Sequence, residues 1–230
     1  MIYGDIIATD THDLSPWRDV AKQHRVLDIV FDAAPDRYFI LGDMGEQLRS
    51  VAAWLSSDIL QREKLLAEHC GVYFVPGNWP HADRSYLNRL ARRLYPIQVW
   101  QADYVEWTLP DRVVRGLHGH QFDHRLRHWL RWRWITPVLP AVTRRILRHL
   151  PSELLAQDNS SEYMATVCDI DQEAQRYAIK HNCDILMGHD HRNYKSAADD
   201  HIIYHLGADG MRGHSALARI TDKITLIPVD

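Results

Sequence analysis

Side chains that could bind a metal ion follow five short, largely apolar runs of the sequence. The last of these sites is Gly188-His189-Asp190-His191, which comes directly after residues 183–187. Two imidazoles at positions i and i+2 of a loop can turn toward one point or toward two neighbouring points. The other four sites are Asp10 with His12, Gly42-Asp43, Gly77-Asn78 and His118-Gly119. Five such sites at the ends of apolar runs indicate a metal centre rather than core filling.

The candidate ligands combine neutral imidazoles, carboxylates and one amide oxygen; they are Asp10, His12, Asp43, Asn78, His118, His189 and His191. Such a mixed nitrogen and oxygen set suits manganese, iron or zinc better than magnesium or calcium. Seven ligands are too many for one tetrahedral ion, but they suit two ions joined by a bridging carboxylate. Asp43 is the natural bridge between an Asp10/His12 cluster and an Asn78/His118 cluster. We therefore expect two divalent ions, with manganese first and iron or zinc as alternatives.

Two ions about 3.5–4 Å apart can activate a bridging water and stabilise the attacking and leaving oxygens of a phosphoryl displacement. The expected reaction is thus hydrolysis of a phosphodiester or pyrophosphate by a metal-bound hydroxide. Asp43 supports that hydroxide and is counted as catalytic for this reason.

Strands and helices that alternate along the chain must position these side chains. Strands are expected at residues 2–8, 37–41, 72–75 and 183–187, and each stops at a candidate site. The apolar spacing predicts helices through Val20 and Phe31, from Leu48 to about Cys70, and over residues 162–180. A hairpin over residues 99–116 and strands at 202–206, 215–220 and 224–228 complete the prediction. This pattern indicates an α/β layered domain, in which functional groups gather at the carboxyl ends of strands.

One segment differs in character from the rest of the chain. Between His124 and Ser152 there are seven arginines and no acidic residue. Tryptophans and Pro137 and Pro140 indicate short helices there. We expect one domain over residues 1–230 with a helical insertion, or cap, at 124–165. Its apolar stripe and arginines suit a surface of anionic lipid, or a nucleic-acid backbone as a weaker alternative, or simple packing with a solvated face.

Composition sets the broad class of the protein. Of the 230 residues, 46% are hydrophobic, which is enough to bury a core, and the three cysteines are too few for a disulfide framework. No apolar stretch approaches the roughly 18 residues that span a bilayer. The N-terminal residues lack the pattern of a secretory signal. We expect a cytoplasmic protein whose segment 124–150 could contact the inner face of the membrane.

The five motifs, in this order and at these spacings, closely resemble the calcineurin-like metallophosphoesterases. The resemblance spans residues 10–191 and implies a sandwich of two mixed β-sheets flanked by helices. It also implies that His191 joins Asp10 and His12 on one metal ion. By the same likeness, Asn78, His118 and His189 hold the other ion.

The chain departs from the family pattern at two positions. The family usually has His-Asp or Arg-Asp after its Gly-Asn pair, whereas this chain has Trp79-Pro80. Trp79 cannot protonate a leaving group, so His81 is the candidate for that catalytic role. His120 replaces the acidic residue that often follows the family's His-Gly pair.

Within the family, residues 118–123 and the basic insertion are most similar to the UDP-2,3-diacylglucosamine pyrophosphatases. That likeness implies a lipid-linked nucleotide such as UDP-diacylglucosamine as the phosphate-ester substrate. The expected substrate contacts are Trp79, Asp123, Arg125 and Trp129. Two rival functions stay open: a nuclease or cyclic-nucleotide phosphodiesterase, and a non-catalytic scaffold with the same fold.

Overall fold

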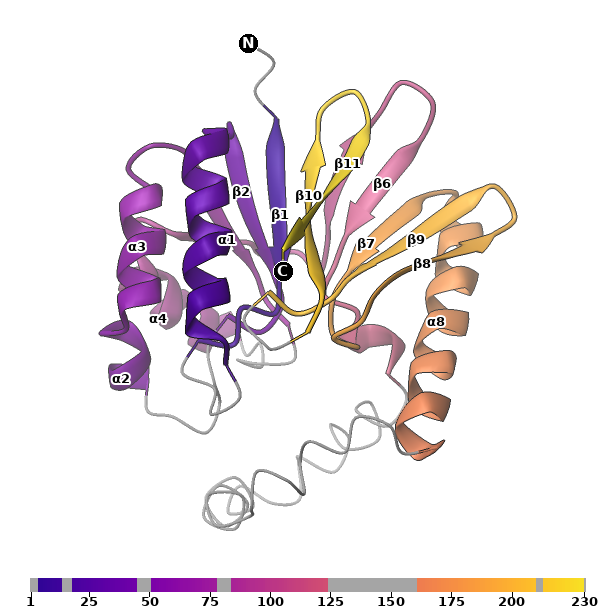
Figure 1. The fold of residues 1–230 in the computed structure, drawn as a ribbon, viewed down its shortest axis with the longest axis horizontal. Helices are drawn as coiled ribbons and strands as arrows, with labels where there is room; N and C mark the ends of the chain where they lie inside the picture. The colour runs from indigo at the N-terminus through magenta and orange to yellow at the C-terminus, as the bar shows by residue number, and fades with distance from the viewer. Residues whose placement is uncertain are drawn as a thin grey trace.

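Two β-sheets pack face to face at the centre of the fold, and helices cover both outer faces (Figure 1). The computed structural model describes residues 4–13, 18–44, 51–77, 84–123, 161–209 and 213–229. The first strand along the chain, β1, lies in the middle of the first sheet. The expected architecture, two mixed sheets flanked by helices, is confirmed.

The first sheet has the strand order β11-β10-β1-β2-β3-β4. Strands β1 to β4 run parallel, while β10 is antiparallel to both of its neighbours. The strands are β1 (Asp5–Thr9), β2 (Arg37–Leu41), β3 (Gly71–Val75), β4 (Gln98–Val99), β10 (Ser215–Ile220) and β11 (Ile224–Val229).

The second sheet has the order β5-β6-β7-β9-β8, with a parallel centre and an antiparallel strand at each edge. Its strands are β5 (Val105–Thr108), β6 (Val113–Gly116), β7 (Asp184–Met187), β8 (Asn193–Ala198) and β9 (His201–Leu206). The expected hairpin is the antiparallel pair β5 and β6.

The helices form the two outer layers (Figure 1). Against the first sheet lie α1 (Val20–Ala33), α2 (Val51–Leu55), α3 (Asp58–Leu66) and α4 (Arg84–Leu94). Against the second sheet lies α8 (Ser161–His181), with a short 3-10 turn, η1 (His120–Phe122).

Alternating side chains let each central strand serve two cores, because successive residues of a strand point to opposite faces. In β2, Tyr38 and Ile40 pack in the helix-side cluster, while Phe39 and Leu41 pack between the sheets. In β7, Leu186 joins the core between the sheets, and Ile185 and Met187 pack with α8. Strands buried on both faces read as continuous apolar runs, which is why the sequence identified them.

The single long helix expected from Leu48 to about Cys70 is wrong. The described part of this region holds two helices, α2 and α3, which are separated at Ser56 and Ser57. The Ser57 hydroxyl accepts a hydrogen bond from the Leu60 amide at 3.2 Å and donates one to the Asp13 carboxylate. Ser57 is therefore the N-cap of a new helix, a role that serine favours over a helix interior.

The expected insertion is only partly within the described residues. Residues 124–160 lie outside them, and α8 begins at Ser161. Among the helices that the structure describes, none is both long and apolar enough to cross a membrane.

Replacing Ser57 by alanine should lower the free energy of unfolding by about 1–2 kcal/mol, because both the helix cap and the bond to Asp13 are lost. Denaturant unfolding of wild type and variant measures this difference. Ser56→Ala is the matched control, since Ser56 is exposed and bonds only the nearby Ala53 carbonyl oxygen. Equal losses in the two variants would contradict the capping role.

Candidate metal centre at the strand ends

The carboxyl ends of strands from both sheets meet at one place. After β1 the Asp10 amide donates to the Leu41 carbonyl oxygen at 3.2 Å, which joins the ends of β1 and β2. In the second sheet the Gly188 amide donates to the His118 carbonyl oxygen at 3.2 Å. The two sheets are joined by Asp10, whose Oδ2 accepts the His189 amide hydrogen bond at 2.5 Å. The structure thus brings together the strand ends of four of the five candidate sites.

A first group of possible ligands consists of Asp10, His12 and His191. Each offers one ligand atom, and these atoms lie within 4.8 Å of one another. The Nε2 atoms of His12 and His191 are 3.1 Å apart, and their rings meet edge to face. His191 is exposed and His12 is half-buried, so this group opens toward solvent.

A second group consists of Asp10, Asp43 and His118, all buried. His118 Nε2 lies 2.8 Å from Asp10 Oδ1. The ring of His189 lies beside that of His118, with centroids 4.8 Å apart. Asp10 is the carboxylate common to both groups, and the bridging role of Asp43 stays a prediction.

Two further residues support the histidines of this cluster. Asp123 Oδ2 lies 3.2 Å from His189 Nε2, so this carboxylate can orient the imidazole of a ligand histidine. His120 Nδ1 lies 3.1 Å from His118 Nδ1. Asp123 was expected as a substrate contact. Because its carboxylate is within hydrogen-bond distance of His189, it lies beside the candidate ligands.

Burial and charge in the cluster favour the protonation states that metal binding needs. Burial opposes ionisation of Asp10, but His118, His191 and His12 outweigh it and hold the pKa of Asp10 well below its usual range. Loss of hydration and the neighbouring His191 lower the pKa of His12 to about 3. Burial likewise lowers the pKa of His118. Ionised carboxylates and neutral imidazoles are the forms that bind metal ions.

The backbone at the candidate ligands is strained. Asp10, His12, His189 and His191 have φ of 47°, 44°, 69° and 56°, in the left-handed region that side chains other than glycine rarely adopt. Each such residue costs on the order of 1–3 kcal/mol, and strain of this kind concentrates at functional sites. The left-handed turns let residues i and i+2 of each short loop aim at the same cluster.

Glycines leave the room that the ligand side chains occupy. A Cβ at Gly42 would meet the His118 ring and would lie 2.8 Å from Asp10 Oδ1. A Cβ at Gly77 would lie 2.6 Å from both Asp43 Oδ1 and His118 Nδ1. One at Gly188 would collide with the Asp10 carboxylate. Glycine is thus required beside three of the five sites by the close approach of the ligands themselves.

Five of the expected functional residues fall outside the described part of the chain: Asn78, Trp79, His81, Arg125 and Trp129. Sequence reasoning gave no role to Asp209, a buried carboxylate beside the end of β1. It follows β9 and exchanges two hydrogen bonds with Thr9, whose amide donates to Asp209 Oδ2 at 2.9 Å. Its place after a strand was the available signal, but no histidine accompanies it. Burial raises its pKa to about 7.

Comparison with known proteins gives matches among solved structures. No protein-family model and no curated protein sequence matches the chain. A novel archaeal phosphodiesterase superposes with a TM-score of 0.48 at 14% identity, covering 97% of this chain and 98% of its own. The phosphoesterase YfcE from E. coli has a TM-score of 0.48 at 12% identity, with 98% and 99% covered. Vps29 from Entamoeba histolytica has a TM-score of 0.46 at 12% identity, with the same coverage.

A further solved structure superposes over the whole of both chains with a TM-score of 0.50 at 12% identity. Likenesses at such low identity concern the fold alone. The neighbours include proteins described as phosphoesterases. They have no bearing on the UDP-diacylglucosamine branch, and the argument for a function rests on the residues of the site.

Gly77→Ala should weaken metal binding by about 10- to 100-fold, because the new Cβ displaces both Asp43 and His118. Calorimetric titration of the metal-free protein with Mn²⁺ measures the affinity. Gly71→Ala is the matched control, since it lies at the far end of β3 and the atoms nearest to its Cβ would be those of the Tyr73 side chain. Wild-type affinity in Gly77→Ala would show that this side of the cluster does not hold the ion.

Proposed function

We propose that the chain is a metal-dependent phosphoesterase whose site holds two divalent ions at the carboxyl ends of β1, β2, β6 and β7. The observation that carries this proposal is the pair of ligand groups that share Asp10. One buried carboxylate between two sets of imidazole and carboxylate ligands is an arrangement suited to two neighbouring ions. Phosphoryl transfer is the chemistry that such paired sites serve in many enzymes.

The residues present fit such a centre. The donor set is mixed nitrogen and oxygen, which suits manganese, iron or zinc. The lowered pKa values of Asp10 and His12 keep a carboxylate ionised and an imidazole neutral near neutral pH. The glycines at 42, 77 and 188 leave the ligand side chains the space they need. Manganese is the metal we propose first.

When bound, the two ions would supply Lewis acidity and an activated water for attack on phosphorus. The chain's own residues would set the geometry. Asp10 and Asp43 bring negative charge to a buried place, and His118 is fixed by its contact with Asp10 at 2.8 Å. Asp123 faces Nε2 of His189, which leaves Nδ1 of that ring for a ligand role. Asn78 would complete the second ion's ligands, as the family resemblance implies.

The substrate we propose is a phosphodiester or pyrophosphate with an apolar or nucleotide part, such as a lipid-linked nucleotide. Support comes from the sequence of residues 124–150, which interleaves arginine with tryptophan and leucine. Arg125 and Trp129 are the proposed contacts from that segment, and Trp79 is a third. A peripheral position at a membrane surface is part of this proposal, because arginine and tryptophan suit an interface with anionic lipid.

Two other functions are favoured by specific observations. The arginines of residues 124–150 would also bind the phosphates of a nucleic acid or cyclic nucleotide. In that case substrate binding should weaken steeply as the salt concentration rises. Trp79-Pro80, in place of the family's usual residues, favours a non-catalytic scaffold. A scaffold need hold no metal, so metal content separates it from either enzyme.

The activity test is hydrolysis of bis-p-nitrophenyl phosphate and p-nitrophenyl phosphate by the purified, manganese-supplemented protein. We expect turnover of the diester that ceases when a chelator removes the metal. Asp43→Asn should abolish it without loss of fold, because the buried carboxylate is replaced by an amide of the same shape. The matched control is Asp103→Asn, because Asp103 is exposed and lies in the segment between β4 and β5.

Retained turnover in Asp43→Asn would defeat the role of this carboxylate. Metal binding with no turnover of either ester would point to a narrow substrate, and a lipid-linked nucleotide pyrophosphate would be tried next. A protein that neither binds metal nor turns over substrate would leave the scaffold.

His81→Ala should lower turnover only for substrates whose leaving group needs a proton. p-Nitrophenolate leaves without protonation, so its esters should be hydrolysed at nearly the wild-type rate, whereas alkyl esters should slow by about 10²- to 10⁴-fold. The comparison of kcat between the two ester types measures this. An equal loss on both would show that His81 is not the general acid.

A further inference from the structure

A buried histidine outside the ligand set connects the cluster of candidate ligands to α8, the helix on the outer face of the second sheet. His205, the fifth residue of β9, has no exposed surface. Its Nδ1 lies 2.7 Å from Asp190 Oδ2, and its Nε2 lies 3.1 Å from Asp171 Oδ1. Each ring nitrogen therefore faces a carboxylate oxygen.

This arrangement favours a charged imidazolium. A neutral imidazole carries one N–H, so its second nitrogen would present a lone pair to a carboxylate. Burial alone would lower the pKa of His205, but the hydrogen bonds to Asp171 and Asp190 and their charges raise it above its ordinary value. The ring of Tyr194 stacks on the imidazole with centroids 3.9 Å apart and planes 15° apart.

The inner carboxylate, Asp190, lies between the candidate ligands His189 and His191. Its Oδ1 accepts the Arg192 amide hydrogen bond at 3.2 Å, while Oδ2 faces His205. The Asp190 amide in turn donates to the Gly188 carbonyl oxygen at 2.8 Å. Asp190 is thus held at both carboxylate oxygens and at its backbone, and the two residues that flank it adopt the strained left-handed conformation.

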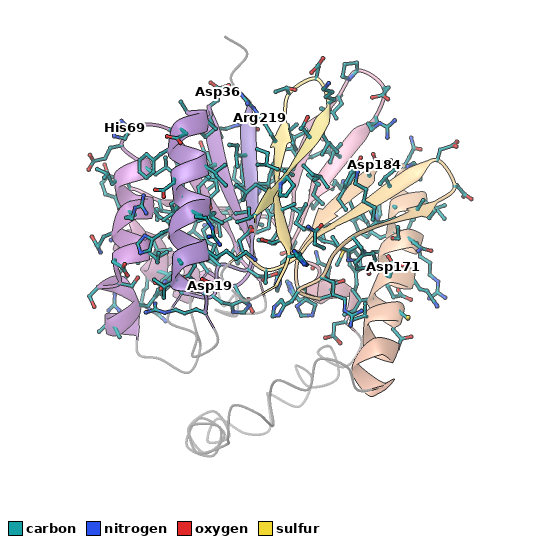
Figure 2. All side chains as sticks on the ribbon, viewed as in Figure 1. Asp19, Asp36, His69, Asp171, Asp184 and Arg219 are labelled. Carbon is teal, nitrogen blue, oxygen red and sulfur yellow. The ribbon has the colours of Figure 1, made fainter. Side chains whose placement is uncertain are left out.

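The outer carboxylate, Asp171, belongs to α8, where Figure 2 labels it. It also accepts hydrogen bonds from the Ser196 hydroxyl and from Gln175 Nε2, the latter at 2.8 Å. These contacts, together with His205, hold the pKa of Asp171 below its usual value against the opposing effect of burial. The chain Asp171–His205–Asp190 therefore runs from the outer helix, through β9, to the loop that carries two candidate ligands.

We propose that His205 is a positioning residue for the metal centre: clamped between Asp171 and Asp190, it holds the turn that aims His189 and His191 at the ligand cluster. The consequence for metal binding rests on the proposed function, whereas the order of the turn does not. Without the clamp, the left-handed residues can relax to ordinary backbone conformations, because their strain persists only where surrounding contacts impose it.

The first arm of the test uses metal-free protein and measures amide hydrogen exchange in residues 188–192. In His205→Gln, whose side chain cannot donate to both carboxylates with a positive charge, the Asp190 and Arg192 amides should exchange at least about tenfold faster than in wild type. His201→Gln is the matched control, because His201 lies on the same strand, 3.9 Å from Asp184 and away from the cluster. It should leave the exchange of this loop unchanged.

Asp171→Ala provides a variant that leaves the loop and β9 untouched. It should speed exchange in the same amides, although less than His205→Gln, because the imidazolium keeps its inner partner. The double variant should exchange no faster than His205→Gln alone, since both changes break one chain of contacts. Unchanged exchange in Asp171→Ala and His205→Gln, or simple addition of their effects, would overturn the proposal.

The second arm measures Mn²⁺ affinity by calorimetry in the same five proteins. His205→Gln should bind about 10- to 100-fold more weakly, and His201→Gln should match wild type. Equal affinities in His205→Gln and wild type would overturn the positioning role. If wild type itself binds no metal, the proposed function fails, and the exchange arm alone still decides whether His205 holds the turn.

Discussion

The structure depends on hydrogen bonds and opposite charges that stabilise one fully buried carboxylate, that of Asp10. Asp10 has no exposed surface, and an ionised carboxylate removed from water costs several kcal/mol unless hydrogen bonds and opposite charge replace its hydration. The replacement comes from three other strand ends. The Asp43 amide lies 3.3 Å from Oδ1, His118 Nε2 lies 2.8 Å from the same oxygen, and the His189 amide donates to Oδ2. The strand ends of both sheets must therefore pack against Asp10.

The same requirement explains why strained backbone residues and glycines are concentrated at this edge of the fold. For the side chains to converge on Asp10, the backbone after β1 and after β7 turns through left-handed residues. The neighbouring glycines allow the loops to approach more closely than any side chain would permit. The two apolar cores that pack against each central strand supply the rigidity that holds these local costs in place.

Much of this arrangement could be predicted from the sequence. Strands buried on both faces appear as apolar runs, and the ligand residues follow those runs directly, so the strands and the converging sites were both identified. The break between α2 and α3 was missed because apolar spacing continues across it, although the Ser56-Ser57 pair was an available capping signal. Strand β8 was missed because its residues are only partly buried and its apolar content is low.

Other features follow from contacts that no local pattern reveals. Aspartate and histidine adopt left-handed φ more readily than most side chains, but no local pattern shows that Asp10 and His191 are the ones that do so. The sharing of Asp10 by two ligand groups depends on distances between residues more than 100 positions apart. His205 was placed in an expected strand, but its partners lie 15 and 34 residues away in sequence. Its clamp could be found only in three dimensions.

The central claim is that these strand ends hold two metal ions around Asp10. It is tested most directly by crystals of the manganese-reconstituted protein, with anomalous scattering to place the ions and elemental analysis to count them. The account predicts two ions per chain, one beside Asp10, His12 and His191 and the other beside Asp43 and His118. A reconstituted protein that contains no manganese, or whose ions lie away from these residues, would contradict it.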